Sequence, residues 1–142
     1  MITWARTRSP WAEPDFEVEL TDLAGALTAI ARSAVHRAID PQLVNLDRIV
    51  INEWRRFPEL VMFGRPTPLS PRMQLVMDLL RWHEADGAIE VDDIKMAAEQ
   101  FLAMVTLIPA RLASVGIFRP WDVEERYIEH AVRLFVRTLK RS

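Results

Sequence analysis

The sequence contains no cysteine, which excludes disulfide bonds and thiolate metal sites and suits a reducing cytoplasm. Only four of its 142 residues are glycine, so a glycine-rich phosphate-binding loop has no basis. No apolar run approaches the ~18 residues that a membrane-spanning helix needs, and residues 1–6 lack the apolar segment of a signal peptide. We therefore expect a soluble, cytoplasmic protein with no membrane association.

Catalytic and metal-binding motifs are also missing. No His-x-x-x-His or Glu-x-x-His pair is present to hold a metal, and there is no Gly-x-Ser-x-Gly nucleophile motif. The acidic pairs Asp92-Asp93 and Glu124-Glu125 lie at predicted helix starts, where capping and the helix dipole explain them. The three histidines fall in three different predicted helices: His36, His83 and His130. We expect no enzymatic activity, no metal and no cofactor.

No charge of one sign dominates the chain. The formal net charge is −2, and acidic and basic residues are mixed along the sequence. A protein that binds nucleic acid on its own usually has a cluster of basic residues, and this chain has none in its sequence pattern. We expect no DNA binding by this chain alone.

What the sequence does contain is a succession of helical patterns. Half of its residues are apolar, which is enough for one hydrophobic core in a domain of this length. Residues 1–14 show neither a helical nor a strand period, whereas apolar residues recur at helical spacing from Asp15 onward. We predict an all-α fold with five principal helices, in which residues 15–142 form a single helical domain after an irregular segment at 1–14.

Local signals predict where the first three helices begin and end. Asp15 opens the first helix, while Asp40-Pro41 and Ser70-Pro71 each provide an N-cap followed by proline. The second helix should end before Pro58, and Asp86-Gly87 should close the third.

The last two helices follow a short extended link at residues 88–91. The fourth should start at Asp92 and end or kink at Pro109, with residues 111–113 as its continuation. Residues 122–125 form a capping box, with Asp122 as the cap, that should start the fifth.

The fourth and fifth helices carry more apolar surface than one core contact needs. From Phe101 to Ile108 apolar side chains cover nearly the whole circumference, and from Tyr127 to Leu139 the apolar arc is roughly twice the ~100° stripe of a surface helix. Exposed surface of that extent is rare on a monomer. We predict a symmetric homodimer in which the last two helices of each subunit form a four-helix bundle. The predicted contact residues are Phe101, Val105, Ile108, Leu112, Ile128, Ala131, Phe135 and Leu139.

Large aromatic and thioether side chains lie on the second, third and fourth predicted helices. Together they could line an adaptable apolar pocket, or they could simply fill the core, which is the simpler explanation for any one of them. His83 would supply a polar group to such a pocket. The candidate pocket residues are Trp54, Phe57, Met73, Met77, Trp82, His83, Phe101 and Met104.

Several segments, in this order, carry a resemblance to a known family. They are residues 49–60 (IVINEWRRFPEL), residues 87–93 (GAIEVDD) running into residues 97–102 (AAEQFL), and residues 130–135 (HAVRLF). Over about residues 15–140 the chain resembles the C-terminal, ligand-binding and dimerisation domain of TetR/AcrR-type bacterial transcriptional regulators, specifically the AefR-like branch. Such regulators begin with a three-helix DNA-binding unit, and nothing upstream of Asp15 is long enough to form one.

The resemblance implies a function for the chain. It would be an effector-binding and dimerisation domain without its own DNA-binding unit. Its partners would be a second copy of the chain and an apolar or aromatic small molecule bound between the helices. The alternative is a ligand-free helical interaction protein that homodimerises or sequesters a full-length regulator.

Overall fold

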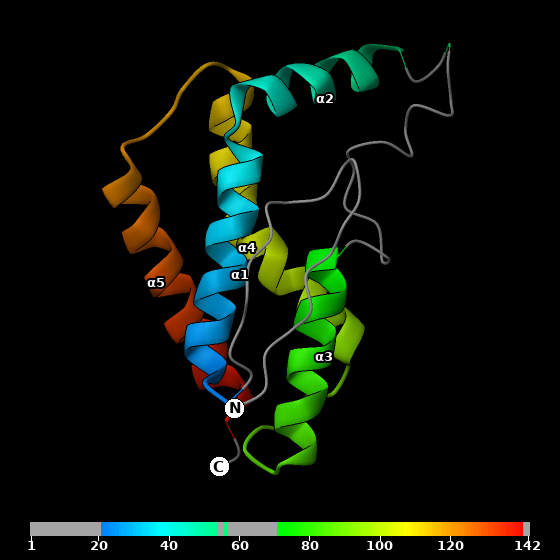
Figure 1. Cartoon of the computed structure of the whole chain (residues 1–142), viewed down its shortest axis with the longest axis vertical. Coiled ribbons are helices and arrows are strands. Elements are labelled where there is room, and N and C mark those ends of the chain that lie inside the picture. The colour runs from blue at the N-terminus through cyan, green and yellow to red at the C-terminus, as the bar shows by residue number, and fades with distance from the viewer. Residues whose placement is uncertain (1–20, 54–55, 57–70, 141–142) are drawn as a thin grey trace.

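The computed structural model describes residues 21–53, 56 and 71–140, and within them the chain is helical (Figure 1). An isolated antiparallel bridge joins Ile89 to Lys140. The all-α prediction with five principal helices is therefore confirmed, whereas the predicted irregular segment at 1–14 lies outside the described residues. The helices are α1 (Leu23–Ala38), α2 (Pro41–Glu53), α3 (Pro71–Ala85), α4 (Ile94–Ser114) and α5 (Trp121–Leu139).

The first helix starts later than the predicted position at Asp15. Its N-cap is Asp22, whose carboxylate accepts a hydrogen bond from the Gly25 N–H at 3.0 Å. A Cβ atom at residue 25 would collide with this carboxylate, so the glycine lets the cap approach closely. Thr21 and Asp22 are not helical, so no helix runs unbroken from Asp15 into α1, and residues 15–20 lie outside the described part.

Two helix boundaries follow the proline and glycine signals of the sequence. Asp40 caps α2 by accepting from the Gln42 N–H at 2.9 Å, and Pro41 is the first helical residue, as predicted. Gly87 closes α3 with a φ of 83°, a left-handed conformation that favours glycine. The predicted cap Ser70 and the predicted second-helix end near Pro58 lie outside the described residues.

The boundaries of α4 differ from the prediction by small steps. Asp93, rather than Asp92, is the N-cap and accepts from the Met96 N–H at 3.0 Å. Pro109 lies inside the helix, which continues to Ser114. Pro109 has no N–H to donate, so the helix loses one hydrogen bond there without ending, and the proline ring is buried.

The capping box predicted for α5 is wrong. The helix begins at Trp121, its N-cap is Pro120, and no side chain caps it. Glu124 instead is 2% exposed and forms an ion pair with Arg119. The buried Glu124 carboxylate is therefore paired with Arg119 from the loop that precedes α5.

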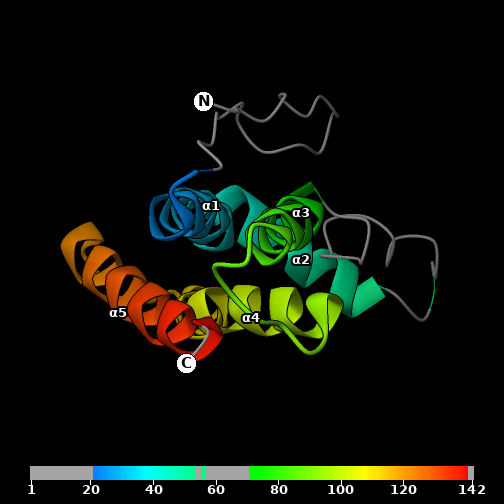
Figure 2. The same cartoon turned by 90° about the horizontal axis from the view of Figure 1, so that it is seen from below.

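The helices pack in two layers, with α1 and α3 in one and α4 and α5 in the other (Figure 2). Helix α2 crosses one end of the bundle, next to the end of α4 (Figure 1). The core lies between the layers, and all four layer helices contribute to it. In this core the rings of Phe101 and Phe135 meet with centroids 4.8 Å apart. Its fully buried residues include Leu27, Ile30, Leu79, Leu80, Phe101 and Ile128.

Candidate functional site

The residues predicted to form the dimer contact lie mostly in the core of the protomer itself. Only Ile108, at 41% exposed, and the partly buried Leu112 retain surface for a partner. The prediction placed the other six on surplus surface, but α4 packs against α1, α2, α3 and α5, so a wide part of its circumference is used within one chain. The six buried residues are Phe101, Val105, Ile128, Ala131, Phe135 and Leu139.

The exposed surface of α4 lies on the side opposite to its buried stripe. Met96, Gln100, Ala103 and Leu107 are all exposed and follow one another at intervals of four, three and four residues, which aligns them along one side of a helix. Two of these side chains are large and apolar: Met96 is 55% exposed and Leu107 is 57% exposed.

Helix α5 continues this surface beside α4. His130, Leu134 and Thr138 are exposed at intervals of four residues, and Leu134 is 44% exposed. Because α4 and α5 form one layer of the molecule (Figure 2), these stripes belong to the side turned away from α1 and α3. We call the seven residues the outer face: Met96, Gln100, Ala103, Leu107, His130, Leu134 and Thr138.

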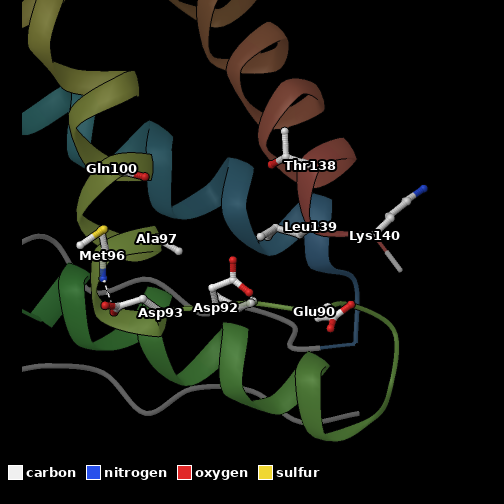
Figure 3. Close-up of a pocket in the computed structure, with 10 residues that line it drawn as sticks. Glu90, Asp92, Asp93, Met96, Ala97, Gln100, Thr138, Leu139 and Lys140 are labelled. Carbon is white, nitrogen blue, oxygen red and sulfur yellow. Dashed lines mark hydrogen bonds between the residues drawn. The ribbon is translucent and has the colours of Figure 1, made fainter. Parts of the chain in front are cut away.

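A groove of about 430 Å³ opens between the start of α4 and the end of α5. Its apolar wall is formed by Val91, Ala97 and Leu139, and its rim carries the carboxylates of Glu90 and Asp92. Figure 3 shows Asp92 between the two helices, with Thr138 and Leu139 across from Gln100 and Ala97. The remaining lining residues are Asp93, Met96 and Lys140.

No pattern in the sequence predicted this groove. Its two sides come from residues 90–100 and 138–140, and the backbone joins them where the Glu90 N–H donates to the Leu139 carbonyl at 2.9 Å. Within the described part of the chain, no three His, Cys, Asp or Glu side chains are placed to hold a metal ion.

The residues predicted to line an effector pocket divide into three groups. Trp54 and Phe57 lie outside the described residues. Met73, His83 and Phe101 are buried, and Met77, Trp82 and Met104 are partly buried against the hydrophobic core. His83 lies edge-on to the Trp82 ring, with centroids 4.8 Å apart. None of the six described residues lines the groove between α4 and α5.

Contacts between α1 and the start of α5 were not anticipated from the sequence. Glu125 accepts a hydrogen bond from Arg32 and pairs with it, which raises the pKa of the Arg32 guanidinium. One turn further along α1, His36 is exposed yet stacks on Trp121, with ring centroids 3.9 Å apart and an interplanar angle of 15°. Glu125 is therefore a tertiary contact rather than a helix-start charge.

One buried arginine links α3 to α1. Arg72 is 8% exposed and donates to the Ser33 carbonyl at 3.0 Å and to its hydroxyl at 3.1 Å. Burial lowers the pKa of Arg72 to about 9, so the guanidinium remains charged at neutral pH.

Helix α4 is long and apolar enough to cross a membrane by length and composition alone. Its fully buried Phe101 and Val105 pack in the hydrophobic core, which is the usual reason for such a composition in a bundle helix. It is not a convincing membrane span.

The chain forms a two-layered all-α domain, and comparison with known proteins identifies its family. Residues 25–140 match the family described as AefR-like transcriptional repressor, C-terminal domain. The chain therefore belongs to this family of TetR-type regulator domains.

Two solved structures have the same fold. The flavonoid-responsive regulator FrrA is 28% identical, with a TM-score of 0.74, over 87% of this chain and 64% of its own. A TetR-family transcriptional regulator from Mesorhizobium loti MAFF303099 is 20% identical, with a TM-score of 0.71, over 84% of this chain and 60% of its own. The chain thus spans about three fifths of the length of these relatives. A search of curated proteins gives no match.

Proposed function

We propose that this chain is the effector-binding and dimerisation domain of a TetR-type transcriptional regulator and that it pairs with a second copy through the outer face. The observation that carries the proposal is the exposure of Met96, Leu107 and Leu134 on one side of two adjacent core helices. TetR-family regulators typically homodimerise and bind small-molecule effectors. Apolar side chains gathered on one face favour burial against a like surface, and a two-fold axis makes such a contact self-complementary.

Charge substitutions at the outer face test the dimer. Leu107→Glu and Leu134→Glu should each yield a monomer, because a desolvated carboxylate in the contact opposes association. Ile49→Glu is the matched control, since Ile49 is 55% exposed but lies on α2. Phe135 does not serve this purpose, because it is 7% exposed and its replacement would disturb the core.

Light scattering at low micromolar concentration measures the molecular mass of each variant in solution. The wild type and Ile49→Glu should have about twice the protomer mass of 16.4 kDa, and the two leucine variants should have the protomer mass. A wild-type monomer would contradict the proposed dimer. Dimers of both leucine variants would move the contact away from the outer face.

The proposed effector is an apolar or aromatic small molecule bound among α3, α4 and the adjoining helices. Met77, Trp82 and Met104 support this part of the proposal, because they pack at the margin of the core and two of them are flexible thioethers. FrrA is described as flavonoid-responsive, which makes flavonoids a reasonable first set of probes.

Thermal shift with a flavonoid panel and a panel of aliphatic amphiphiles tests effector binding. A ligand at about 100 times its Kd should add roughly 2.7 kcal/mol of stability. Trp82→Leu should reduce that gain, while Trp121→Leu, a partly buried tryptophan on α5, should retain it. If no compound shifts the wild-type melting temperature, the chain is better described as a ligand-free interaction protein.

A further inference from the structure

Two exposed side chains of opposite charge border the outer face, one on each of its helices. Glu99 lies on α4, three residues after Met96 and four before Ala103. Arg137 lies on α5, three residues after Leu134. Within the described residues, neither charge forms an ion pair in its own chain. Both are therefore available to a second copy of the chain.

Helical spacing places the two charges on the flanks of α4 and α5 that are turned away from each other. At ~100° per residue, Glu99 lies about 160° around α4 from Ala97, which lines the groove toward α5. By the same measure Arg137 lies about 160° around α5 from Phe135, whose ring meets Phe101 of α4. The two charges therefore lie at opposite edges of the layer that the two helices form.

The two charges also stand at the same level along that layer. Helices α4 and α5 run antiparallel, and the contact between the rings of Phe101 and Phe135 sets their register (Figure 1). Glu99 comes two residues before Phe101, and Arg137 comes two residues after Phe135. Each charge is therefore displaced by about 3 Å from the ring contact, toward the same end of the layer.

A two-fold axis parallel to the two helices would bring these opposite edges together. When two copies meet through their outer faces about such an axis, each α4 lies over the partner's α5, and every residue keeps its level along the axis. The rotation also exchanges the two edges of the partner's layer. The flank of α4 that carries Glu99 would therefore lie over the flank of α5 that carries the partner's Arg137.

The charges of α5 oppose the other two-fold arrangement. An axis across the helices would set α5 against the partner's α5, with the same flank of both copies on the same side. That flank carries Arg126, Arg133 and Arg137, all exposed, so arginines would face arginines. The acidic residues Asp122 and Glu129 lie further from the outer face around the helix. Like charges brought together in this way oppose association.

We propose that Glu99 pairs with the partner's Arg137 at both edges of the dimer and so sets each α4 over the partner's α5 in one register. The inference rests on the dimer proposed above and adds its orientation. Ala103 supports this register, because it stands within one residue of the level of Leu134 and its small side chain leaves room for the partner's Leu134. An ion pair at the margin of a contact stays partly in water, so it selects the orientation more than it strengthens the dimer.

Charge reversal at the two positions tests the pairing. Glu99→Arg and Arg137→Glu should each weaken the homodimer roughly fivefold or more at low salt, since both attractive contacts of the dimer become repulsive. The double variant Glu99→Arg/Arg137→Glu should dimerise with an affinity close to that of the wild type, because opposite charges face each other again. These differences should shrink at high salt. Sedimentation velocity over a range of protein concentrations measures each dissociation constant.

Arg126→Glu is the matched control. Arg126 lies on the same flank of α5, about three turns before Arg137, but the residue of α4 at its level is Ala110. The control should leave the dimer affinity close to that of the wild type.

Three results would overturn the pairing while leaving the dimer in place. One is a wild-type dimer that is indifferent to both charge reversals, and another is an equal loss of affinity in Arg126→Glu. The third is tighter association of Arg137→Glu, which would show that arginines face arginines across the other axis. Only a monomeric wild type would remove the dimer as well.

Discussion

At the scale of single residues, the carboxylate of Glu124 is the most deeply buried charge on α5. It is 2% exposed and pairs with Arg119, whose guanidinium also lies over the Tyr127 ring at 5.3 Å. The Nε atom of Arg119 is buried without a hydrogen-bond partner. The arginine is therefore held in place by its ion pair and its ring contact, and the loop before α5 is held with it.

Arg119→Ala should cost about 3 kcal/mol of unfolding free energy, because it leaves the Glu124 carboxylate buried without its cation. Urea denaturation measures the loss. The control is Arg111→Ala, an exposed arginine on α4, which should change stability by less than about 0.5 kcal/mol. Arg119→Met/Glu124→Leu should recover most of the loss, since no charge is left in the site. A loss below about 1 kcal/mol for Arg119→Ala would mean that water reaches Glu124.

The role of Glu124 shows what a local reading of sequence misses. Its place at the start of a predicted helix suggested a charge that interacts with the helix dipole, and nothing nearby in the sequence reveals that Arg119 turns back toward it. The same holds for Glu125, whose partner Arg32 lies 93 residues earlier in the chain. Charges near a helix start are explained by the dipole only when no distant partner is brought close by the fold.

At the scale of helices, the boundaries that could be predicted are those whose signals are local. Asp40-Pro41 and Asp86-Gly87 act on their own backbone neighbours, and the structure uses both as expected. The choice between Asp92 and Asp93 as the cap of α4 was not decided by composition, because both are good N-cap residues. Only the hydrogen bond to Met96 separates them.

Asp93→Ala should therefore destabilise the protein by about 1 kcal/mol, whereas Asp92→Ala should have little effect on the stability of the protomer. Both are compared by thermal denaturation in a Leu134→Glu background, so that association does not contribute. Equal effects of the two substitutions would show that the cap is shared.

The width of an apolar arc was a good guide to how many neighbours a helix has, but not to which neighbours they are. Phe101, Val105 and Phe135 were expected at a subunit contact, and they are covered instead by helices of the same chain. The spacing of apolar residues in the sequence determines how much of a helix's circumference is apolar. Which helix, of the same chain or of a partner, covers each part of it depends on the tertiary structure. The exposed stripe of Met96, Ala103 and Leu107 lies on the opposite side of α4 from the buried stripe that contains Phe101 and Val105.

At the scale of the whole molecule, the family could be identified from the order of the segments along the chain. The groove could not, since residues 90–97 and 138–140 meet only when α4 and α5 pack in antiparallel directions. The inner side of this layer completes the core, and in the proposed dimer its outer face would contact the second copy. Folding and dimerisation would then be coupled through the same two helices.

This coupling predicts that thermal stability depends on protein concentration. A ligand or second copy that binds only the folded state stabilises it by mass action. A hundredfold rise in concentration should therefore add about 2.8 kcal/mol per dimer, since each tenfold change is worth about 1.4 kcal/mol. Calorimetry across that range should show a wild-type Tm that rises by a few degrees, while the Tm of Leu134→Glu stays constant. A wild-type Tm that does not change over a range in which light scattering detects the dimer would mean that the dimer separates before the protomers unfold. The outer face would then add no stability to α4 and α5.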